Sequence, residues 1–216
     1  LELEYCKEDY HLPLLKSEED VRYERAQKWS GLNQKVVVGI NTGCATTIQA
    51  KRLSVDNHRD LICKLQKASQ ISIVLLGGPE DTLRNSQIAE GFQDVVLSPT
   101  TKGLRDGLVS VAACDLIITG DSLGMHMAIS QKKIVLAWFG PTCAHEIELF
   151  DRGLKFITQA SCSPCWKRSC HKPVMCYDLV ILDEIVQATT NYIHQYRYPD
   201  SLSGGLTFSR SSFDLG

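Results

Sequence analysis

The chain has 216 residues, enough for one domain with a full hydrophobic core and appended segments. Hydrophobic residues are 44%, charged residues 22% and the formal net charge is −2, which suits a soluble globular protein and argues against a nucleic-acid or membrane-surface partner. We expect no transmembrane segment and no signal peptide. Nine cysteines, an odd number, then favour a reducing, cytoplasmic setting with free thiols.

The predicted elements alternate between strand and helix after one leading helix. That first helix is predicted from Ser17, as the N-cap, to about Trp29–Gly31. Apolar runs predict strands at 36–40, 71–76, 94–97, 116–119, 134–138 and 155–158. Helices are expected at 55–67, 80–90, 104–113, 124–131 and 182–196. This order predicts an α/β fold, a Rossmann-like three-layer sandwich with a mainly parallel sheet.

The stretch from Cys114 to Thr142 holds two strand-length apolar runs around a short helix. Asp121 and Ser122 follow the first run, and His126 lies one turn into the helix. Because open α/β sheets bind ligands where their strands end, the helix N-terminus could hold a phosphate. In the alternative interpretation, Asp121 or Ser122 only caps the helix and His126 is a buried structural histidine.

A second polar loop follows the strand at 36–40. Gly43 allows a tight turn, Thr46 and Thr47 supply hydroxyls, and Lys51 supplies a cation, which together suit a diphosphate. The loop is not a P-loop, because no Gly-Lys-Ser/Thr closes it. A solvent-exposed polar loop is the alternative.

A glycine turn follows the strand at 71–76 and ends at Glu80. The Glu80 carboxylate could accept a hydrogen bond from a ribose hydroxyl. The alternative is that it only favours the N-terminus of the next helix. Both interpretations place Glu80 at the same edge of the sheet as the two polar loops.

Four cysteines lie within fifteen residues near the end of the predicted sheet. They are Cys162, Cys165, Cys170 and Cys176. Four thiolates at close spacing can hold Zn²⁺ or an Fe–S cluster, although the intervals between them are not those of a standard zinc ribbon. Plain buried thiols without a metal are the alternative, and no metal ligand is assigned on this ground.

Taken together, these motifs resemble one family. Their order and spacing are similar to those in the C-terminal half of ADP-heptose:lipopolysaccharide heptosyltransferases, glycosyltransferase family 9. The motifs are the loop Gly43…Lys51-Arg52, the run 75–80, Asp-Ser-Leu-Gly-Met-His-Met-Ala at 121–128, Phe-Gly-Pro-Thr at 139–142 and the cysteine run. The resemblance covers about residues 39–186. It implies a GT-B fold, in which two Rossmann-like halves face each other across the active-site cleft.

The resemblance implies roles for eight residues. Thr46, Thr47 and Lys51 resemble contacts on the phosphate side, and Glu80 resembles the acid on the nucleoside side. The donor-diphosphate loop corresponds to Asp121, Ser122, Gly124 and His126. Two departures leave the donor's identity open: Leu123-Gly124 replaces the family's Gly-Pro, and Leu53-Ser54 replaces an aromatic residue and a proline.

The resulting functional prediction is the donor-binding domain of an inverting glycosyltransferase that moves a heptose-type sugar from ADP-heptose to a lipopolysaccharide core acceptor. No residue of this chain is assigned as catalytic, because the base and acceptor site belong to the family's N-terminal half. The chain alone is therefore expected to be inactive, to need no cofactor and to lie in the cytoplasm or at the inner membrane's periphery. A Zn- or Fe–S-stapled nucleotide-binding or regulatory module is the alternative.

Three segments are predicted. Residues 1–34 form an interdomain segment with a helix, and 35–197 form the Rossmann-like nucleotide-sugar-binding domain. Within this domain, 160–178 is the cysteine-rich loop. Residues 198–216 are a tail, rich in serine and glycine.

Overall fold

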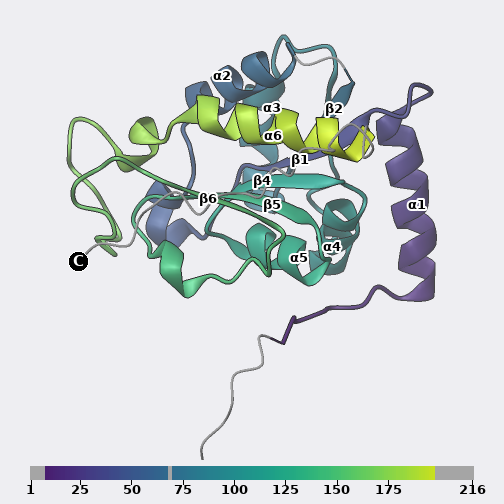
Figure 1. Cartoon of the computed structure of the whole chain (residues 1–216), viewed down its shortest axis with the longest axis horizontal. Helices are drawn as coiled ribbons and strands as arrows, with labels where there is room; N and C mark the ends of the chain where they lie inside the picture. The colour runs from purple at the N-terminus through teal and green to yellow at the C-terminus, as the bar shows by residue number, and fades with distance from the viewer. Residues whose placement is uncertain (1–7, 68–69, 198–216) are drawn as a thin grey trace, which may run out of the picture.

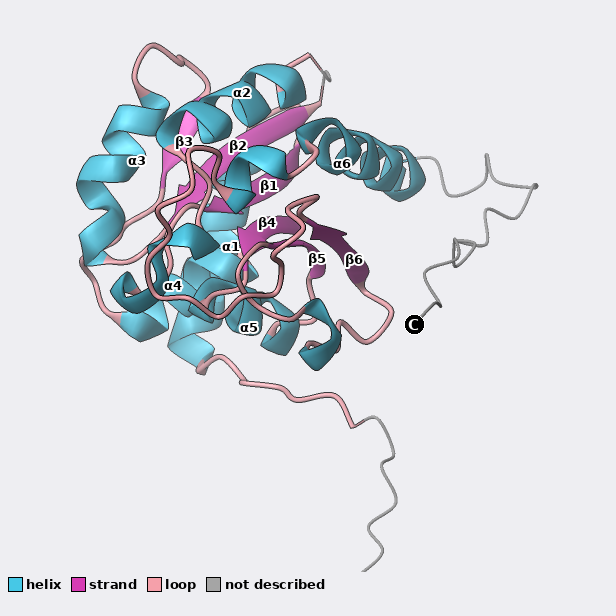
Figure 2. Ribbon diagram, turned by 90° about the vertical axis from the view of Figure 1, so that its left-hand side faces the viewer, coloured by secondary structure: helices cyan, strands magenta, loops and turns pink. Residues whose placement is uncertain are grey.

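The computed structural model describes residues 8–67 and 70–197; the predicted tail at 198–216 lies outside them. A six-stranded parallel sheet occupies the middle of the molecule, in the order β3-β2-β1-β4-β5-β6 (Figure 2). Its strands are β1 (Val36–Asn41), β2 (Ile71–Leu76), β3 (Val95–Leu97), β4 (Leu116–Gly120), β5 (Ile134–Phe139) and β6 (Gly153–Ile157). The predicted α/β fold with a parallel sheet is confirmed.

Helices cover both faces of this sheet (Figure 1). One face carries α2 (Val55–Leu65), α3 (Thr82–Ala89) and α6 (Leu182–Arg197), and the other carries α1 (Lys16–Ser30), α4 (Leu104–Ala112) and α5 (Leu123–Ser130). Short 3₁₀ helices complete the fold: η1 (Thr46–Lys51), η2 (Pro79–Asp81), η3 (Ala144–Glu146) and η4 (Cys176–Leu179).

The strands separate two hydrophobic cores, because successive side chains on a strand point to opposite faces. Val36, Val38 and Ile40 of β1 pack in the core beneath α2, α3 and α6. Val37 lies between them in sequence and packs in the other core, which also contains Trp29 of α1. A strand buried on both faces is a continuous apolar run, which is why the sequence located β1, β2, β4 and β5 well.

Two helix starts differ from the prediction. The first helix begins at Lys16, and Ser17 is not its N-cap; instead the Glu18 carboxylate accepts a hydrogen bond from the backbone N–H of Leu15 at 2.7 Å. The helix predicted at 80–90 is divided into η2 and α3. Pro79 opens η2, and the Asp81 carboxylate accepts from Gly78 N–H, so this turn is a tighter structure of its own.

Candidate functional site

The polar loops predicted from the sequence emerge together at one edge of the sheet. Asn41, the last residue of β1, lies opposite Leu76 of β2 and Thr119 of β4 in the strand register. The loops that follow these three strands enclose a cavity of about 600 Å³, called the edge cavity below. Its position matches the edge at which open α/β sheets bind ligands.

Six of the eight residues predicted for the site line the edge cavity: Lys51, Glu80, Asp121, Ser122, Gly124 and His126. Thr46 and Thr47 are not part of its lining. Both are exposed in the first turn of η1, and Ala45, just before them, contributes to the wall instead. The six lining residues come from the segments that follow β1, β2 and β4, with Gly124 and His126 in the first turns of α5, so the fold brings together what the sequence separates.

Lys51 and Asp121 form an ion pair in the wall of the edge cavity. Lys51 Nζ lies 2.8 Å from Asp121 Oδ2, and the two side chains are 18% and 14% exposed. The chain at Lys51 packs directly on the end of β4, since a Cβ atom at Gly120 would lie 2.2 Å from the Lys51 carbonyl oxygen. A glycine at position 120 thus permits the approach that places the ammonium group beside the loop after β4.

Asn41 organises this loop, and the sequence-based interpretation missed it. Its Nδ2 donates to the Gly43 carbonyl at 3.0 Å and to the hydroxyls of Thr119 and Ser122 at 3.2 and 2.9 Å. A Cβ atom at Gly124 would lie 2.6 Å from Asn41 Cγ. The small residue at 124 therefore lets the first turn of α5 approach Asn41, which gives the departure from the family's Gly-Pro pattern a structural reason.

The N-terminus of α5 points its first N–H groups toward this edge. Ser122 is the N-cap but makes no side-chain capping bond, because its hydroxyl accepts from Asn41. The N–H groups of Leu123 and Gly124 have no acceptor within the helix, since the first turn of any helix lacks one. Together with the helix dipole, they favour an anion at this position.

Asp81 is a second residue that sequence reasoning missed. It is 2% exposed, and its Oδ2 accepts from Gly78 N–H at 3.0 Å. Its other oxygen has no partner within the described residues. Burial raises the pKa of Asp81, opposed by that hydrogen bond from Gly78. A Cβ atom at Gly43 would lie 1.9 Å from Asp81 Oδ2, so Gly43 is required because the loop after β1 passes over this carboxylate.

The far end of the same loop is held by partly buried polar groups. Arg84 Nε donates to the Thr42 carbonyl at 3.2 Å, and its Nη2 donates to the Leu53 carbonyl. Ser54 accepts at its hydroxyl from Asn57 N–H at 3.0 Å and caps α2, and Leu53 is 1% exposed. The two departures from the family pattern at 53 and 54 are thus a core residue and a helix cap.

Beside α4 the edge cavity is lined by apolar and small polar residues. The apolar ones are Pro99, Leu104, Val111 and, from α5, Met127; Gly107 lies among them, and Ser98, Thr100 and Ser110 are the polar ones. A Cβ atom at Gly107 would meet nothing within 4 Å. A cavity with a polar end near a helix N-terminus and an apolar end fits a ligand with an anionic part and a flat hydrophobic part.

The segment before α1 contacts the rim of the edge cavity. Tyr10 Oη and His126 Nδ1 are 3.2 Å apart. The Tyr10 ring packs edge-on against Phe150 at 5.9 Å, and Asp9 pairs with Arg152 at 2.8 Å. These contacts fix one ring nitrogen of His126. The second interpretation of His126, as a buried histidine, is wrong, because the side chain is exposed at the cavity rim.

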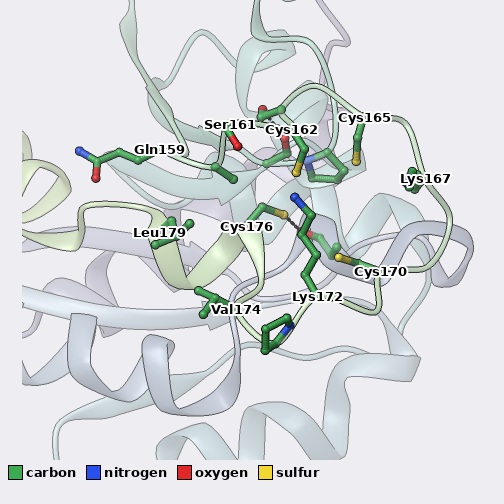
Figure 3. A pocket seen from close by; sticks show the side chains of 16 residues that line it. Gln159, Ser161, Cys162, Cys165, Lys167, Cys170, Lys172, Val174, Cys176 and Leu179 are labelled. Carbon is green, nitrogen blue, oxygen red and sulfur yellow. Dashed lines mark hydrogen bonds between the residues drawn. The ribbon is translucent and has the colours of Figure 1, made fainter.

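The four clustered cysteines line a different cavity of about 340 Å³, called the cysteine cavity below (Figure 3). None of the eight cysteines that the structure describes is in a disulfide. Among the described residues, no three His, Cys, Asp or Glu side chains are already arranged around a common metal position. The Cys162 thiol raises the pKa of Lys172. The four clustered thiols are partly exposed, so the alternative of buried thiols is wrong.

The model for glycosyltransferase family 9 (heptosyltransferase) matches residues 2–175. The chain belongs to this family. The resemblance inferred from the motifs is therefore confirmed. Within residues 8–67 and 70–197, no helix combines the length and apolar character needed to span a membrane.

Family 9 proteins of known structure share this fold. Lipooligosaccharide heptosyltransferase 2 of Campylobacter jejuni is 29% identical over 143 residues, which are 64% of this chain and 45% of that protein. The structure of E. coli ADP-heptose lipopolysaccharide heptosyltransferase II superposes with a TM-score of 0.67 at 18% identity, over 87% of this chain and 54% of that one. The iron-containing heptosyltransferase TibC from enterotoxigenic E. coli, in complex with ADP-D-β-D-heptose, gives a TM-score of 0.54 at 16% identity, over 76% and 46%. This chain thus spans about half the length of the proteins it matches.

Proposed function

We propose that this chain is the donor-binding part of a heptosyltransferase and that the edge cavity holds a nucleotide-diphosphate sugar, with ADP-heptose as the expected donor. Family membership supports the glycosyltransferase class over the alternative of a stapled regulatory module. The choice of ADP-heptose rests on the motif resemblance and is the part that most needs a binding experiment.

The observation that carries this proposal is the meeting of Lys51, Asp121 and the α5 N-terminus in one cavity. In the proposed complex, the diphosphate accepts hydrogen bonds from the N–H groups of Leu123 and Gly124, and the Lys51 ammonium neutralises part of its charge. Asp121 positions the lysine through their 2.8 Å ion pair. Thr46 and Thr47 lie outside the cavity lining, so we place them at most at its outer margin.

The nucleoside is proposed to occupy the apolar end beside α4. There Gly107 leaves room for a flat base, and Val111 and Met127 supply apolar contact. Glu80 lies exposed at the rim and suits a ribose hydroxyl. The polar groups near the N-terminus of α5 and the apolar side chains beside α4 support placing the diphosphate at α5 and the base at α4, rather than the reverse.

The proposed chemistry is metal-independent transfer with inversion at the sugar. Charge develops on the diphosphate leaving group as the glycosidic bond to the sugar breaks, and preorganised N–H groups and a lysine stabilise that charge without rearranging. A carboxylate base would remove the proton of the acceptor hydroxyl. We assign that base, and the lipopolysaccharide core acceptor, to a part of the protein outside this chain, so the chain alone should bind donor and transfer no sugar. A cytoplasmic location, at or near the inner membrane, stays a prediction.

Calorimetry with ADP tests this proposal. The unaltered chain should bind ADP, and Lys51→Ala should weaken binding about 10- to 100-fold, the cost of losing a charge-assisted contact. Lys28→Ala is the matched control, because Lys28 is exposed on α1 and lies outside the cavity lining. Absence of ADP binding by the unaltered chain, or equal losses in both variants, would contradict the proposal.

A further inference from the structure

The chain in front of α1 is held against α5 although it has no helix or strand of its own. Residues 9–13, called the leading segment below, pass beneath α4 and α5 in the view of Figure 1. At the C-terminal end of α5, His11 Nδ1 lies 2.8 Å from the Ser130 carbonyl oxygen, and the Gln131 side chain donates to the Leu12 carbonyl at 2.5 Å. Side-chain contacts therefore fix the leading segment along this helix.

Tyr10 makes the corresponding contacts nearer the start of α5. Its hydroxyl oxygen lies 3.2 Å from His126 Nδ1, and its ring packs edge-on against Phe150 with the ring centres 5.9 Å apart. Arg152 supports both neighbours of Tyr10, because its guanidinium lies 5.5 Å from the Phe150 ring centre and pairs with Asp9 at 2.8 Å. The Tyr10 ring is thus held without its hydroxyl, which leaves the hydroxyl contact with His126 as a separate feature.

His126 is the link between the leading segment and the edge cavity. Tyr10 is not part of the cavity lining, whereas His126 is. An imidazole has two ring nitrogens, and each can make one hydrogen bond. Nδ1 of His126 faces Tyr10, and Nε2 has no partner among the residues that the structure describes. Nε2 is therefore the nitrogen left for a ligand in the cavity.

The Tyr10 hydroxyl keeps its proton at neutral pH. Burial raises the pKa of Tyr10, and the Asp9 carboxylate adds to this effect against the opposing charge of Arg152. A protonated hydroxyl beside Nδ1 can donate to it, and a neutral imidazole that accepts at Nδ1 carries its own proton on Nε2. In this tautomer the ring offers the ligand an N–H donor, which a phosphate oxygen can accept.

We propose that Tyr10 is a positioning residue for donor binding: its hydroxyl donates to His126 Nδ1 and holds the imidazole so that Nε2–H donates to the diphosphate in the edge cavity. This inference rests on the function proposed above. Ordering an exposed side chain when a ligand binds lowers affinity, and a ring that Tyr10 already holds avoids that loss. A cavity at the carboxyl edge of the sheet is thus completed by a segment that precedes the whole sheet in sequence.

Calorimetry on Tyr10→Phe is the first experiment, because phenylalanine keeps the ring against Phe150 and removes only the hydroxyl. ADP affinity should fall about 3- to 10-fold, the range of one neutral hydrogen bond, whereas adenosine affinity should change less than about twofold. Tyr23→Phe is the matched control and should leave both affinities unchanged. The Tyr23 hydroxyl accepts from Gln27 Nε2 at 2.6 Å on exposed α1, outside the cavity lining.

Nitrogen NMR of the imidazole separates positioning from a general structural effect. The His126 resonances are assigned by their loss in His126→Gln. In the unaltered chain, ADP should shift the Nε2 resonance. Tyr10→Phe should shift the Nδ1 resonance before any nucleotide is added, because the donor to that nitrogen is gone. A change that only loosened the fold would not act on one ring nitrogen selectively.

A double-mutant cycle tests whether Tyr10 acts through His126. His126→Gln should itself weaken ADP binding, and adding Tyr10→Phe to it should cause no further loss. Full additivity of the two changes would overturn the proposal. So would an unchanged ADP affinity in Tyr10→Phe, equal losses for ADP and adenosine, or an Nδ1 resonance that does not respond to the loss of the hydroxyl.

Failure of the function proposed for the edge cavity would look different. If the unaltered chain binds no ADP, that function is contradicted, and the role of Tyr10 in donor binding is contradicted with it. If ADP binds and is weakened by Lys51→Ala but not by Tyr10→Phe, the proposed function stands and the positioning role is wrong.

Discussion

The edge cavity and the cysteine cavity lie on either side of η1 and are built in opposite ways. The walls of the edge cavity are fixed by the chain itself, through the Lys51–Asp121 ion pair, the three hydrogen bonds of Asn41 and the buried Asp81 beneath Gly43. The cysteine cavity has a loop without buried residues and a lysine among its thiols. The edge cavity is thus preorganised, whereas no buried side chain fixes the stretch 159–176 that lines the cysteine cavity.

Gly43→Ala should break the preorganised cavity most severely. The new methyl group would overlap Asp81 Oδ2, which is buried and holds Gly78 N–H. Overpacking and the lost hydrogen bond together should cost about 4 kcal/mol of unfolding free energy. Chemical denaturation measures this cost.

The double variant Gly43→Ala/Asp81→Ala provides the control for that prediction. If the overlap with Asp81 is the cause, truncating Asp81 should recover part of the loss, so that the two changes are clearly non-additive. Strict additivity would show that the methyl group at 43 acts through some other contact.

Acid should destabilise the protein where α2 anchors the end of the loop that carries η1. His58 on α2 is 1% exposed, and its Nδ1 lies 2.8 Å from the Ser54 carbonyl. Burial, reinforced by the Arg84 charge, lowers the pKa of His58 to about 3. The unfolded chain takes up this proton from about pH 6.5 downward and the folded chain does not, so stability falls as pH drops from 6.5 toward 3.

Between pH 7 and pH 4 this single histidine should account for about 3 kcal/mol of lost stability. Denaturation midpoints measured across that range check the value. His58→Gln, which cannot take up a proton, should flatten this part of the profile. An unchanged slope in the variant would assign the acid sensitivity to other groups.

Gly107→Leu should fill the apolar end of the edge cavity and leave the fold intact. Leucine favours the helix more than glycine does, and the space beside Gly107 is open. We expect ADP and adenosine both to lose about 10- to 30-fold in affinity, about 1.4–2 kcal/mol, while the melting temperature does not fall. Calorimetry with both ligands is the measurement.

The same two ligands distinguish the two ends of the cavity. Lys51→Ala should weaken ADP much more than adenosine, since adenosine has no diphosphate for the ammonium to contact. Equal losses for the two ligands in Lys51→Ala would place the lysine away from the phosphates and reverse the proposed orientation.

Val174→Ala in the cysteine cavity should have the smallest effect. Val174 is 52% exposed in the cysteine-rich loop, so truncation should change the unfolding free energy of the chain by less than about 0.5 kcal/mol. Denaturation curves of the two proteins check this. A loss above about 1 kcal/mol would mean that the loop packs more tightly than its exposure indicates, and would weaken the contrast between the cavities.

Patterns of burial were readable from the sequence. The stretches 36–40 and 73–76 contain no polar side chain because both faces of the central strands are covered. The strand ends then placed Lys51 near Asp121. The register of the parallel sheet then determines which loops lie next to one another. Polar loops that follow neighbouring strands must emerge at the same edge, whatever their separation in sequence.

Residues whose role depends on a specific tertiary contact were not readable. Asn41 looks like any polar residue after a strand, and its importance comes from Thr119 and Ser122, far along the chain. Asp81 follows the more conspicuous Glu80, yet only Asp81 is buried. Ser17 has the residue type of an N-cap, but at the start of α1 it is the Glu18 carboxylate that accepts a hydrogen bond from the Leu15 N–H. Side-chain contacts of this kind override local preference.

A crystal structure of the chain with ADP tests the central claim most directly. The account predicts a diphosphate within hydrogen-bonding distance of the Leu123 and Gly124 N–H groups and of Lys51 Nζ, with the base beside Gly107. A nucleotide bound elsewhere on the protein, with the N-terminus of α5 and Lys51 both free of phosphate, would contradict it.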